Sequence, residues 1–455
     1  MRAGDLVALH CADLDDEGAG VGEVGGLALH VPGALPAEEI EARVAHVSGH
    51  APVAWGELQR VVAASPDRRE AVCPGFGRCG GCALQHLGYE AQLAWKRARV
   101  IRALAAHPAL AGVTVGDTVA SPRVLGYRNN AKLVVARQRG TVALGGYAPR
   151  SHEVVDLIGC QVVEPPLDAV AAELRRLLES APVEIYDERA LTGRLRYAVL
   201  RSNQAGQVLC TLVVARPLPD GPDLADRLRA ARPEVAGVVE HQNSTRGNAI
   251  FAAGGDERTL AGTPELDERL AVGPQTLHVR LTSGAFFQAN REVAGLAYAA
   301  MAEALAVRRT ERVVDAYSGV GGIGLALARD AAEVVGIEAN AAAVANAQAA
   351  ASRNTIDNTR FVAGDAAAIL ATIDRAEVVV VNPPRKGCSP QALAQIARLG
   401  PRAVGYLSCD PDTLARDLAV LAGAGYRPRV VTPHDMLPHT PHVETLAIVE
   451  RPQAA

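Results

Sequence analysis

Short apolar runs separated by glycine turns make up the first 62 residues. Leu6–Leu9 and Leu27–Val31 lie on either side of a glycine-rich stretch at residues 18–26. Strands this short and this regularly interrupted predict a small OB-like β-barrel.

The pattern changes between residues 120 and 265, where strand-like runs are mixed with a helical period. Ala131–Ala136 and Val208–Val214 predict strands, and apolar residues recur at helical spacing over Leu167–Leu178. Repeated glycine and proline between residues 253 and 274 predict a linker. We therefore expect a central α+β unit that ends near residue 270.

From about residue 285 the chain alternates apolar runs with alanine-rich helical stretches. The helical stretches include 339–353 and 391–399. The strand candidates are Arg312–Ala316, Glu333–Ile337, Glu377–Val381, Ala403–Leu407 and Thr445–Val449. Such alternation predicts a Rossmann-like, mostly parallel α/β sheet with helices on both faces.

The length of 455 residues is too great for one core, and we expect three units at 1–62, 63–270 and 271–455. No apolar run approaches the about 18 residues that a membrane span needs, so we expect a cytoplasmic protein without a membrane segment. Eight cysteines in so long a chain do not form a disulfide framework, and clustered ones are more typical of metal binding or catalysis.

Charge is distributed unevenly along the chain. Residues 1–62 carry 3 arginines against 10 acidic residues, whereas residues 63–160 carry 13 basic residues against 6 acidic ones. The basic stretch is the part that we expect to contact a polyanion such as RNA.

A glycine loop follows the first strand of the α/β unit, from Asp315 to Gly324, and it predicts a nucleotide site at a helix N-terminus. Glu338 ends the next strand, where a carboxylate accepts hydrogen bonds from ribose hydroxyls. Asp365 ends the third strand, either contacting an adenine amino group or capping a helix. Asn382 precedes two prolines, which have no N–H, and so supplies the polar group of its loop. The glycine loop alone is equally compatible with a dehydrogenase.

Three cysteines lie close together in a glycine-rich turn. Cys73, Cys79 and Cys82 have the spacing C-x5-C-x2-C, and Cys160 is available as a fourth thiolate. Four thiolates suit either zinc or an iron–sulfur cluster, and the spacing does not decide between them. It differs from the C-x3-C-x2-C of enzymes that cleave S-adenosylmethionine reductively, which favours a structural or RNA-positioning cluster.

Cys409 follows the apolar run 403–407 directly, in the sequence Ser-Cys-Asp-Pro, and so lies at the carboxyl edge of the predicted sheet. Beside a methyl donor, a thiolate there can add to carbon 6 of uracil and make carbon 5 nucleophilic. This scheme needs a cysteine of lowered pKa and a base that removes the carbon-5 proton. Glu444, just before the last strand, is the candidate base. The target uridine must be single-stranded or flipped out.

Taken together, the motifs resemble the RNA 5-methyluridine methyltransferase family, in the form that has an N-terminal TRAM domain and an iron–sulfur cluster. The resemblance spans nearly the whole chain. It rests on the opening barrel, the cysteine set, Tyr127–Leu133, Ser283–Asn290, the Asp315 loop, Asn382–Arg385, Ser408–Pro411 and Asp435–Glu444.

The resemblance implies a class I methyltransferase domain that follows a TRAM-like barrel and a central iron–sulfur domain, and a monomer that methylates uridine carbon 5. It implies ribosomal RNA, with transfer RNA as the alternative substrate. Cys409 matches the nucleophile, Glu444 the base, Phe286 a ring of the uracil pocket, and Arg128 and Lys132 contacts to RNA phosphates. A 4Fe-4S cluster is implied at Cys73, Cys79, Cys82 and Cys160. S-adenosyl-L-methionine is implied at Gln288, Tyr317, Gly322, Glu338, Asp365 and Asn382.

Three features depart from the family pattern. Asn382 stands where aspartate is frequent, which removes a negative charge near the sulfonium. The opening barrel is acidic, and Pro36-Ala37 replaces the usual Pro-Gly. Two other classes of function are alternatives for this sequence. Amino-group methyltransferases carry an aromatic residue where Arg385 stands and need no thiol. An RNA-binding or chaperone module with a vestigial cofactor fold would need neither Cys409 nor Glu444.

Overall fold

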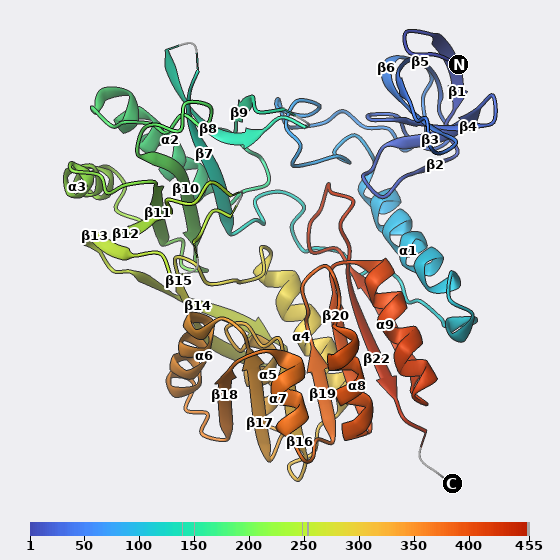
Figure 1. Ribbon diagram of the computed structural model, residues 1–455, viewed down its shortest axis with the longest axis vertical. Helices are drawn as coiled ribbons and strands as arrows, with labels where there is room; N and C mark the ends of the chain where they lie inside the picture. Colours follow the sequence, from blue (N-terminus) through green and yellow to red (C-terminus); the bar gives the residue numbers. More distant parts are fainter. Residues whose placement is uncertain (139, 150, 248, 253, 453–455) are drawn as a thin grey trace.

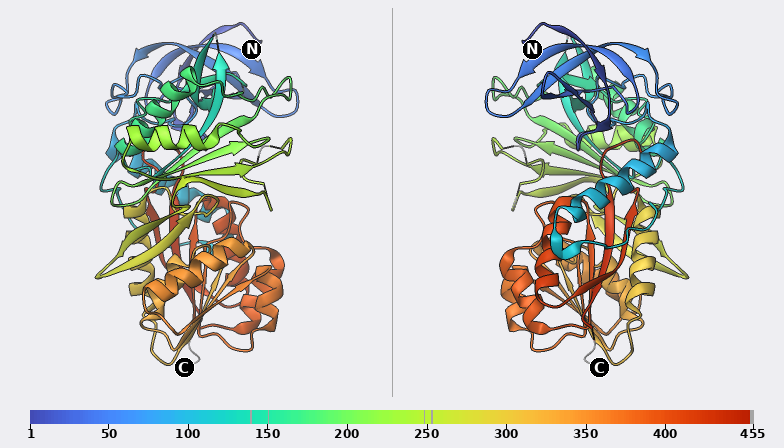
Figure 2. Two further views of the ribbon diagram at one scale, coloured as in Figure 1. Left: turned by 90° about the vertical axis from the view of Figure 1, so that its left-hand side faces the viewer. Right: turned by 90° about the vertical axis from the view of Figure 1, so that its right-hand side faces the viewer.

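The computed structural model describes residues 1–452 except 139, 150, 248 and 253. Figure 1 shows three parts: a small blue sheet at the N-terminus, a green central sheet, and a yellow-to-red sheet flanked by helices. The views of Figure 2 show these parts stacked along the long axis. Among the described residues, no helix is long and apolar enough to cross a membrane.

The N-terminal part is one six-stranded sheet with its own apolar core. Its order is β1-β5-β6-β4-β3-β2. The sheet curls, because the Ala12 N–H at the end of β1 donates to the Val21 oxygen of β3. Gly22 permits this approach, since a Cβ there would lie 2.1 Å from the His10 oxygen. The strands are β1 (Leu6–His10), β2 (Asp13–Leu14), β3 (Gly20–Val24), β4 (Leu27–Val31), β5 (Glu39–Val47) and β6 (Val53–Ala63).

The central part is a seven-stranded sheet of order β13-β12-β11-β10-β7-β8-β9, covered on one face by α2 and α3. The helix predicted at 167–178 is confirmed as part of α2, whose buried leucines pack on the sheet. The elements are β7 (Asn130–Gln138), β8 (Thr141–Tyr147), β9 (Val154–Asp156), α2 (Pro165–Ser180), β10 (Leu195–Ser202), β11 (Val208–Val214), α3 (Gly221–Ala231), β12 (Val235–Gln242) and β13 (Glu257–Gly262).

The linker predicted at 253–274 is wrong. Most of this range belongs to β13 and to β14 (Glu265–Val272), which pairs with β15 (Gln275–Thr282) in a hairpin. The side chains of β14 alternate between buried and exposed, which is the period of a strand with one covered face. Leu266, Leu270 and Leu277 of the hairpin pack into the core of the C-terminal sheet, so the boundary placed at residue 270 falls inside β14.

The C-terminal sheet has the order β18-β17-β16-β19-β20-β22-β21. The first five strands are parallel, and β22 runs antiparallel between β20 and β21. All five predicted strands are confirmed, whereas β21 was not predicted. The strands are β16 (Arg312–Ala316), β17 (Glu333–Glu338), β18 (Thr359–Ala363), β19 (Val378–Val381), β20 (Ala403–Ser408), β21 (Arg427–His434) and β22 (Glu444–Glu450).

Helices cover both faces of this sheet, as the alternation of the sequence predicted. One face packs against α4 (Arg291–Leu305), α5 (Gly322–Ala328), α6 (Ala341–Arg353) and the β14–β15 hairpin. The other packs against α7 (Ala366–Thr372), α8 (Pro390–Leu399) and α9 (Pro411–Gly423). Adjacent residues of a strand serve opposite cores, as Val313 and Val314 do.

Helix α1 (Tyr89–Ala105) and the short helix η1 (Pro108–Leu110) also pack on that second face. Val100 and Leu104 of α1 share a core with Leu414 and Leu418 of α9. Figure 1 shows α1, in light blue, beside the red helix α9. A segment that the sequence analysis assigned to the central unit therefore completes the C-terminal one.

Candidate active site

Several residues predicted to bind the cofactor or to take part in the reaction lie at the carboxyl edge of the parallel strands. Tyr317 follows β16, Glu338 ends β17, Asn382 follows β19 and Cys409 follows β20. Glu444 begins β22, and because β22 is antiparallel to β20 its first residue lies at this same edge. Ligands of open α/β sheets bind at this edge.

The register between β20 and β22 places Cys409 beside Glu444. Ser408 pairs with Thr445 as the last pair of the ladder, so the next positions outward are Cys409 and Glu444. Directly opposed residues of antiparallel strands have Cβ atoms about 4.5–5.5 Å apart and share a face. The Glu444 carboxylate is close enough to the thiol to raise the pKa of Cys409.

The Cys409 thiol is half-buried, and its surroundings do not favour the thiolate. Burial and the neighbouring Glu444 carboxylate raise the pKa of Cys409 to about 11, while the charge of Arg385 opposes this rise. The reaction scheme requires a lowered pKa at Cys409, and the protein without bound cofactor or RNA does not provide it. The physical reason is that desolvation of the thiolate outweighs one partly exposed cation.

Glu444 is 5% exposed, and burial raises its pKa to about 8. Its Oε1 atom has no hydrogen-bond partner among the described residues. At neutral pH the carboxyl group is largely protonated, so the negative charge that would oppose thiolate formation at Cys409 is then largely absent. A carboxyl group with a pKa near the working pH also suits proton transfer.

Arg385 is a functional candidate that the sequence analysis used only to argue against another enzyme class. Its Nη2 lies 3.5 Å from His442 Nδ1. Burial and nearby cations, Arg385 first among them, lower the pKa of His442 to about 4, so the ring is neutral. The charge of Arg385 also acts on Cys409, where it opposes the rise in the pKa of the thiol. The signal in the sequence was the Asn-Pro-Pro-Arg motif itself.

The glycine loop turns sharply between β16 and α5. Gly319 and Gly321 have φ values of +55° and +86°, and Tyr317 has a φ of +65° although it is not glycine. The Glu338 carboxylate accepts the Gly319 N–H at 3.0 Å and the Asn340 N–H at 2.8 Å. Glu338 is therefore held facing the loop, and Gly322, the first residue of α5, packs against the Tyr298 ring.

Asp315 is a buried carboxylate behind this loop whose importance the sequence analysis missed. Its Oδ2 accepts the Gly324 N–H at 2.8 Å, while Oδ1 has no partner among the residues that the structure covers. Burial raises its pKa to about 7. With Glu338 it places two carboxyl groups around the loop, which fits the positive charges of S-adenosylmethionine.

The remaining predicted cofactor residues lie around the same edge. Gln288 is buried, and its side chain lies beside the Tyr298 hydroxyl. Asn382 is half-buried at the end of β19. Asp365 is exposed and accepts the Ala368 N–H at 3.0 Å as the N-cap of α7, so the capping interpretation is confirmed. Its contact with adenine stays a prediction.

Phe286 is 68% exposed, which is unusual for a phenylalanine and leaves its ring accessible to a base. Its segment is tied to the central sheet on both sides. The Ala285 oxygen accepts from Arg201 Nη2 at 2.5 Å, and the Gln288 oxygen accepts from Asn129 Nδ2 at 2.8 Å.

Cys73, Cys79, Cys82 and Cys160 line one cavity of about 270 Å³, together with Arg128 and Lys132. Burial and then the neighbouring thiols, Cys160 first, raise the pKa of Cys82 to about 12. Deprotonated thiols packed this closely need a cation. Among the described residues, however, no three cysteine, histidine or acidic side chains form a group that could hold a metal ion.

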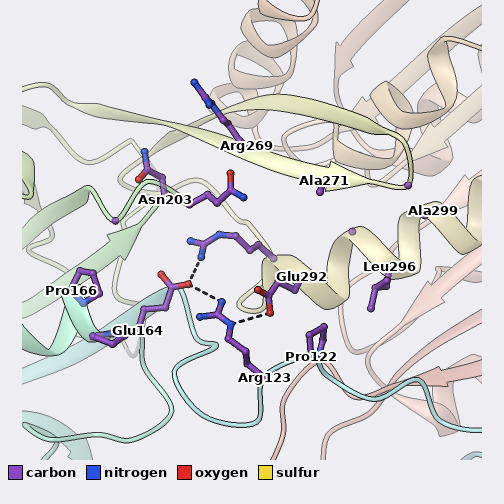
Figure 3. A pocket seen from close by; sticks show the side chains of 16 residues that line it. Pro122, Arg123, Glu164, Pro166, Asn203, Arg269, Ala271, Glu292, Leu296 and Ala299 are labelled. Carbon is purple, nitrogen blue, oxygen red and sulfur yellow. Dashed lines mark hydrogen bonds and ion pairs between the residues drawn. The ribbon is translucent and has the colours of Figure 1, made fainter.

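Another cavity, of about 680 Å³, lies between the central sheet, the β14–β15 hairpin and α4 (Figure 3). Four of the charged residues that line it pair with one another: Arg123 bonds Glu292 at 3.0 Å, and Glu164 lies between Arg123 and Arg291. None of the predicted site residues lines it.

The fold and the cluster of groups at its carboxyl edge define an S-adenosylmethionine-dependent methyltransferase. Residues 166–452 match the family described as tRNA (uracil-5-)-methyltransferase. The chain therefore belongs to this family of RNA methyltransferases.

Relatives of similar length support this assignment. An uncharacterized RNA methyltransferase of Halalkalibacterium halodurans is 36% identical over 99% of this chain and 98% of its own. One of Geobacter sulfurreducens is 37% identical over 98% of this chain and 90% of its own. The Pyrococcus abyssi tRNA (uracil-54, C5)-methyltransferase, solved with S-adenosyl-L-homocysteine, has a TM-score of 0.77 at 26% identity, covering 97% of this chain and 100% of that one.

Proposed function

We propose that the protein methylates carbon 5 of a uridine in RNA through a covalent adduct between Cys409 and carbon 6 of the base. The observation that carries this proposal is that Cys409 and Glu444 are the next residues beyond the last β20–β22 pair, Ser408–Thr445, at the carboxyl edge of the parallel strands. An amino-group methyltransferase needs neither group, and Arg385 stands where such an enzyme has its stacking ring.

Bound S-adenosyl-L-methionine would supply an activated methyl group, held by Gln288, Tyr317, Gly322, Glu338, Asp365 and Asn382. The Cys409 thiol gives up its proton to solvent, with Arg385 stabilising the thiolate, and the thiolate adds to carbon 6 of the uracil. Carbon 5 then accepts the methyl group, with S-adenosyl-L-homocysteine as the leaving group. Glu444 removes the proton from carbon 5, and the carbon–sulfur bond breaks to release 5-methyluridine and the thiolate.

The direct test is to identify the methylated nucleoside. The protein is incubated with methyl-labelled S-adenosyl-L-methionine and RNA, and the RNA is digested to nucleosides and analysed by mass spectrometry. Label in 5-methyluridine supports the proposal. Label in N-methylated adenosine or cytidine would establish the amino-group alternative, and binding without methylation would indicate the non-enzymatic one.

For the substrate we propose ribosomal RNA, because the cysteine set matches the cluster-bearing form of the family. Transfer RNA is the second candidate, favoured by the structural similarity to the Pyrococcus abyssi enzyme, which acts on tRNA. Purified ribosomal and transfer RNA, each lacking 5-methyluridine and each supplied alone, discriminate between the two.

Release of product is expected to depend on pH through Glu444. Its pKa is raised to about 8, so the basic carboxylate form accumulates as the pH rises towards 8. Decay of a preformed Cys409 adduct should therefore accelerate about tenfold per pH unit below 8 and level off above it. The measurement is a pH jump from pH 6 followed by gel analysis of the adduct. A decay rate that does not change with pH would contradict this role of Glu444.

We also propose that Cys73, Cys79, Cys82 and Cys160 hold a 4Fe-4S cluster, on the basis of the family resemblance and of their common cavity. Cys79→Ser should lose most of the bound iron and the brown absorbance while retaining methyl transfer in a single turnover. Iron and sulfide analysis of anaerobically purified protein measures this, with Cys210→Ser, a buried cysteine outside the cavity, as the control. An unchanged iron content in Cys79→Ser would remove this assignment.

The contacts to RNA are assigned in the same way. Arg128 and Lys132 lie on the basic stretch and are proposed to bind phosphates, with Phe286 packing on the target base. A TRAM-like character of the unit at 1–62 and a monomeric state complete the proposal. The observed sheets replace the boundaries 63–270 and 271–455, since β14 spans residue 270 and α1 packs on the C-terminal sheet.

A further inference from the structure

Glu444 reaches the active site at the end of an irregular segment, Asp435–Val443, that lies between β21 and β22. We name residues 435–443 the base-bearing segment. It contains His439, whose φ of 67° is unusual for a residue with a side chain. A backbone of this kind persists only where its surroundings hold it.

The surroundings that hold it come from more than 300 positions earlier in the chain. The His439 oxygen accepts the Leu84 N–H at 2.9 Å, and the His439 N–H donates to Gln92 Oε1 at 2.9 Å. The segment 84–92 therefore binds both the N–H and the carbonyl oxygen of His439. Gln92 also donates to the oxygens of Leu84 and Leu87, which fixes that piece on helix α1.

Two further residues of α1 bind the base-bearing segment. Lys96 is fully buried, forms an ion pair with Asp435 and donates to the Leu437 oxygen at 3.1 Å. Arg99 donates to the Pro441 oxygen at 3.0 Å. Gln92, Lys96 and Arg99 follow one another at helical spacing, so one face of α1 is built to bind this segment.

A further contact comes from Tyr127, which is 1% exposed and donates its hydroxyl to the Pro438 oxygen at 3.0 Å. Tyr127 also lines the cysteine cavity. Its neighbours Gly126 and Arg128 donate their N–H groups to the oxygens of Gln161 and Val162, at 2.9 Å each. Tyr127 is therefore held by the residues that follow Cys160.

The cysteine cavity is thus connected to the base-bearing segment along two short paths. Leu84 is two residues beyond Cys82, and Tyr127 is bonded to the residues just beyond Cys160. On the Cys82 side, Leu84 donates a hydrogen bond to His439. On the Cys160 side, Tyr127 donates one to Pro438.

We infer that Tyr127, Gln92 and Leu84 are positioning residues for Glu444, and that the four cysteines set the position of the base by ordering Leu84 and Tyr127. The inference rests on the proposed function, since it gives the cysteine cavity a role in that reaction. None of these contacts involves Cys409, on which methyl transfer depends. The step that they govern is removal of the carbon-5 proton.

The test compares Tyr127→Phe with Tyr426→Phe. Tyr426 is also 1% exposed and also donates its hydroxyl to a proline oxygen, that of Pro401 at 2.9 Å, but at the opposite edge of the sheet. Tyr127→Phe should slow decay of the Cys409 adduct about fivefold, the factor that one lost hydrogen bond accounts for. Single-turnover methyl transfer should change less than about twofold, and Tyr426→Phe should change neither step.

A second measurement needs no RNA. Hydrogen exchange of peptides that cover 435–444 should accelerate in Tyr127→Phe and in iron-depleted Cys79→Ser, but not in Tyr426→Phe. Equal adduct decay in the two tyrosine variants, or unchanged exchange in iron-depleted Cys79→Ser, overturns the inference. Absence of any adduct in the unaltered protein overturns the proposed function instead, and the exchange measurement then still tests the contacts.

Discussion

Cys409→Ala is expected to abolish methylation, with a loss in rate on the order of 10⁴-fold or more. Carbon 5 of uracil becomes nucleophilic only after a nucleophile has added to carbon 6, and Cys409 is the thiol that follows β20 at the cofactor edge. The variant should bind S-adenosyl-L-methionine normally, because the glycine loop and Glu338 do not depend on the thiol. Isothermal titration of the cofactor together with labelled-methyl incorporation separates binding from chemistry.

The same variant gives a second, sharper result with RNA that contains 5-fluorouridine. Fluorine cannot leave carbon 5 as a proton does, so the unaltered protein should accumulate a methylated covalent complex that survives denaturing electrophoresis. Cys409→Ala should form none. Cys388→Ala is the matched control, since Cys388 is a buried thiol outside the Cys409–Glu444 pair. Methylation of uridine by Cys409→Ala at the normal rate would end the proposal.

Glu444→Gln is expected to have the next largest effect and to leave the first half of the reaction intact. The amide keeps the size of the side chain but cannot accept the carbon-5 proton, so turnover should fall by about 10²–10⁴-fold. Methyl transfer in the first turnover should continue, and a methylated adduct should accumulate on ordinary uridine. The amide is also uncharged at every pH. At high pH, where Glu444 is ionised and hinders formation of the Cys409 thiolate, the first turnover of the variant should therefore not be hindered in this way.

Rapid quench of Glu444→Gln with labelled cofactor measures both halves at once, as label bound to protein and label in free RNA. Glu450→Gln, at the far end of the same strand β22, is the control. Release of product by Glu444→Gln at the rate of the unaltered protein would require a different base. The next candidate is Asp315, which is also a buried carboxyl group with a raised pKa.

The strands and helices of the C-terminal sheet were predictable because their signals are local. A run such as Val378–Val381 is buried on both sides and leaves no alternative to a central strand. The position of Cys409 after such a run was equally readable. Glu444 was also predicted as the base, but the local pattern could not place it beside Cys409, because that depends on β22 entering the sheet antiparallel, and β21 was not predicted at all.

Two errors show what local patterns leave out. Gly262, Pro264 and Gly273 suggested a linker, but they mark the ends of strands whose alternation of buried and exposed positions was the stronger signal. The raised pKa of Cys409 was not foreseen, because burial depends on tertiary packing. The role of helix α1 was hidden for the same reason, since the burial of its polar residues at 92, 96 and 99 appears only in the structure.

The pairing of Lys96 with Asp435 joins positions 339 residues apart. At about 5–20 residues per second of synthesis, α1 leaves the ribosome roughly 17–70 seconds before its partner exists. During that interval a lysine and the apolar side chains of Val100 and Leu104 have no core to enter. Helix α1 can therefore complete the core of the C-terminal sheet only after the strands and helices of that sheet have been synthesised.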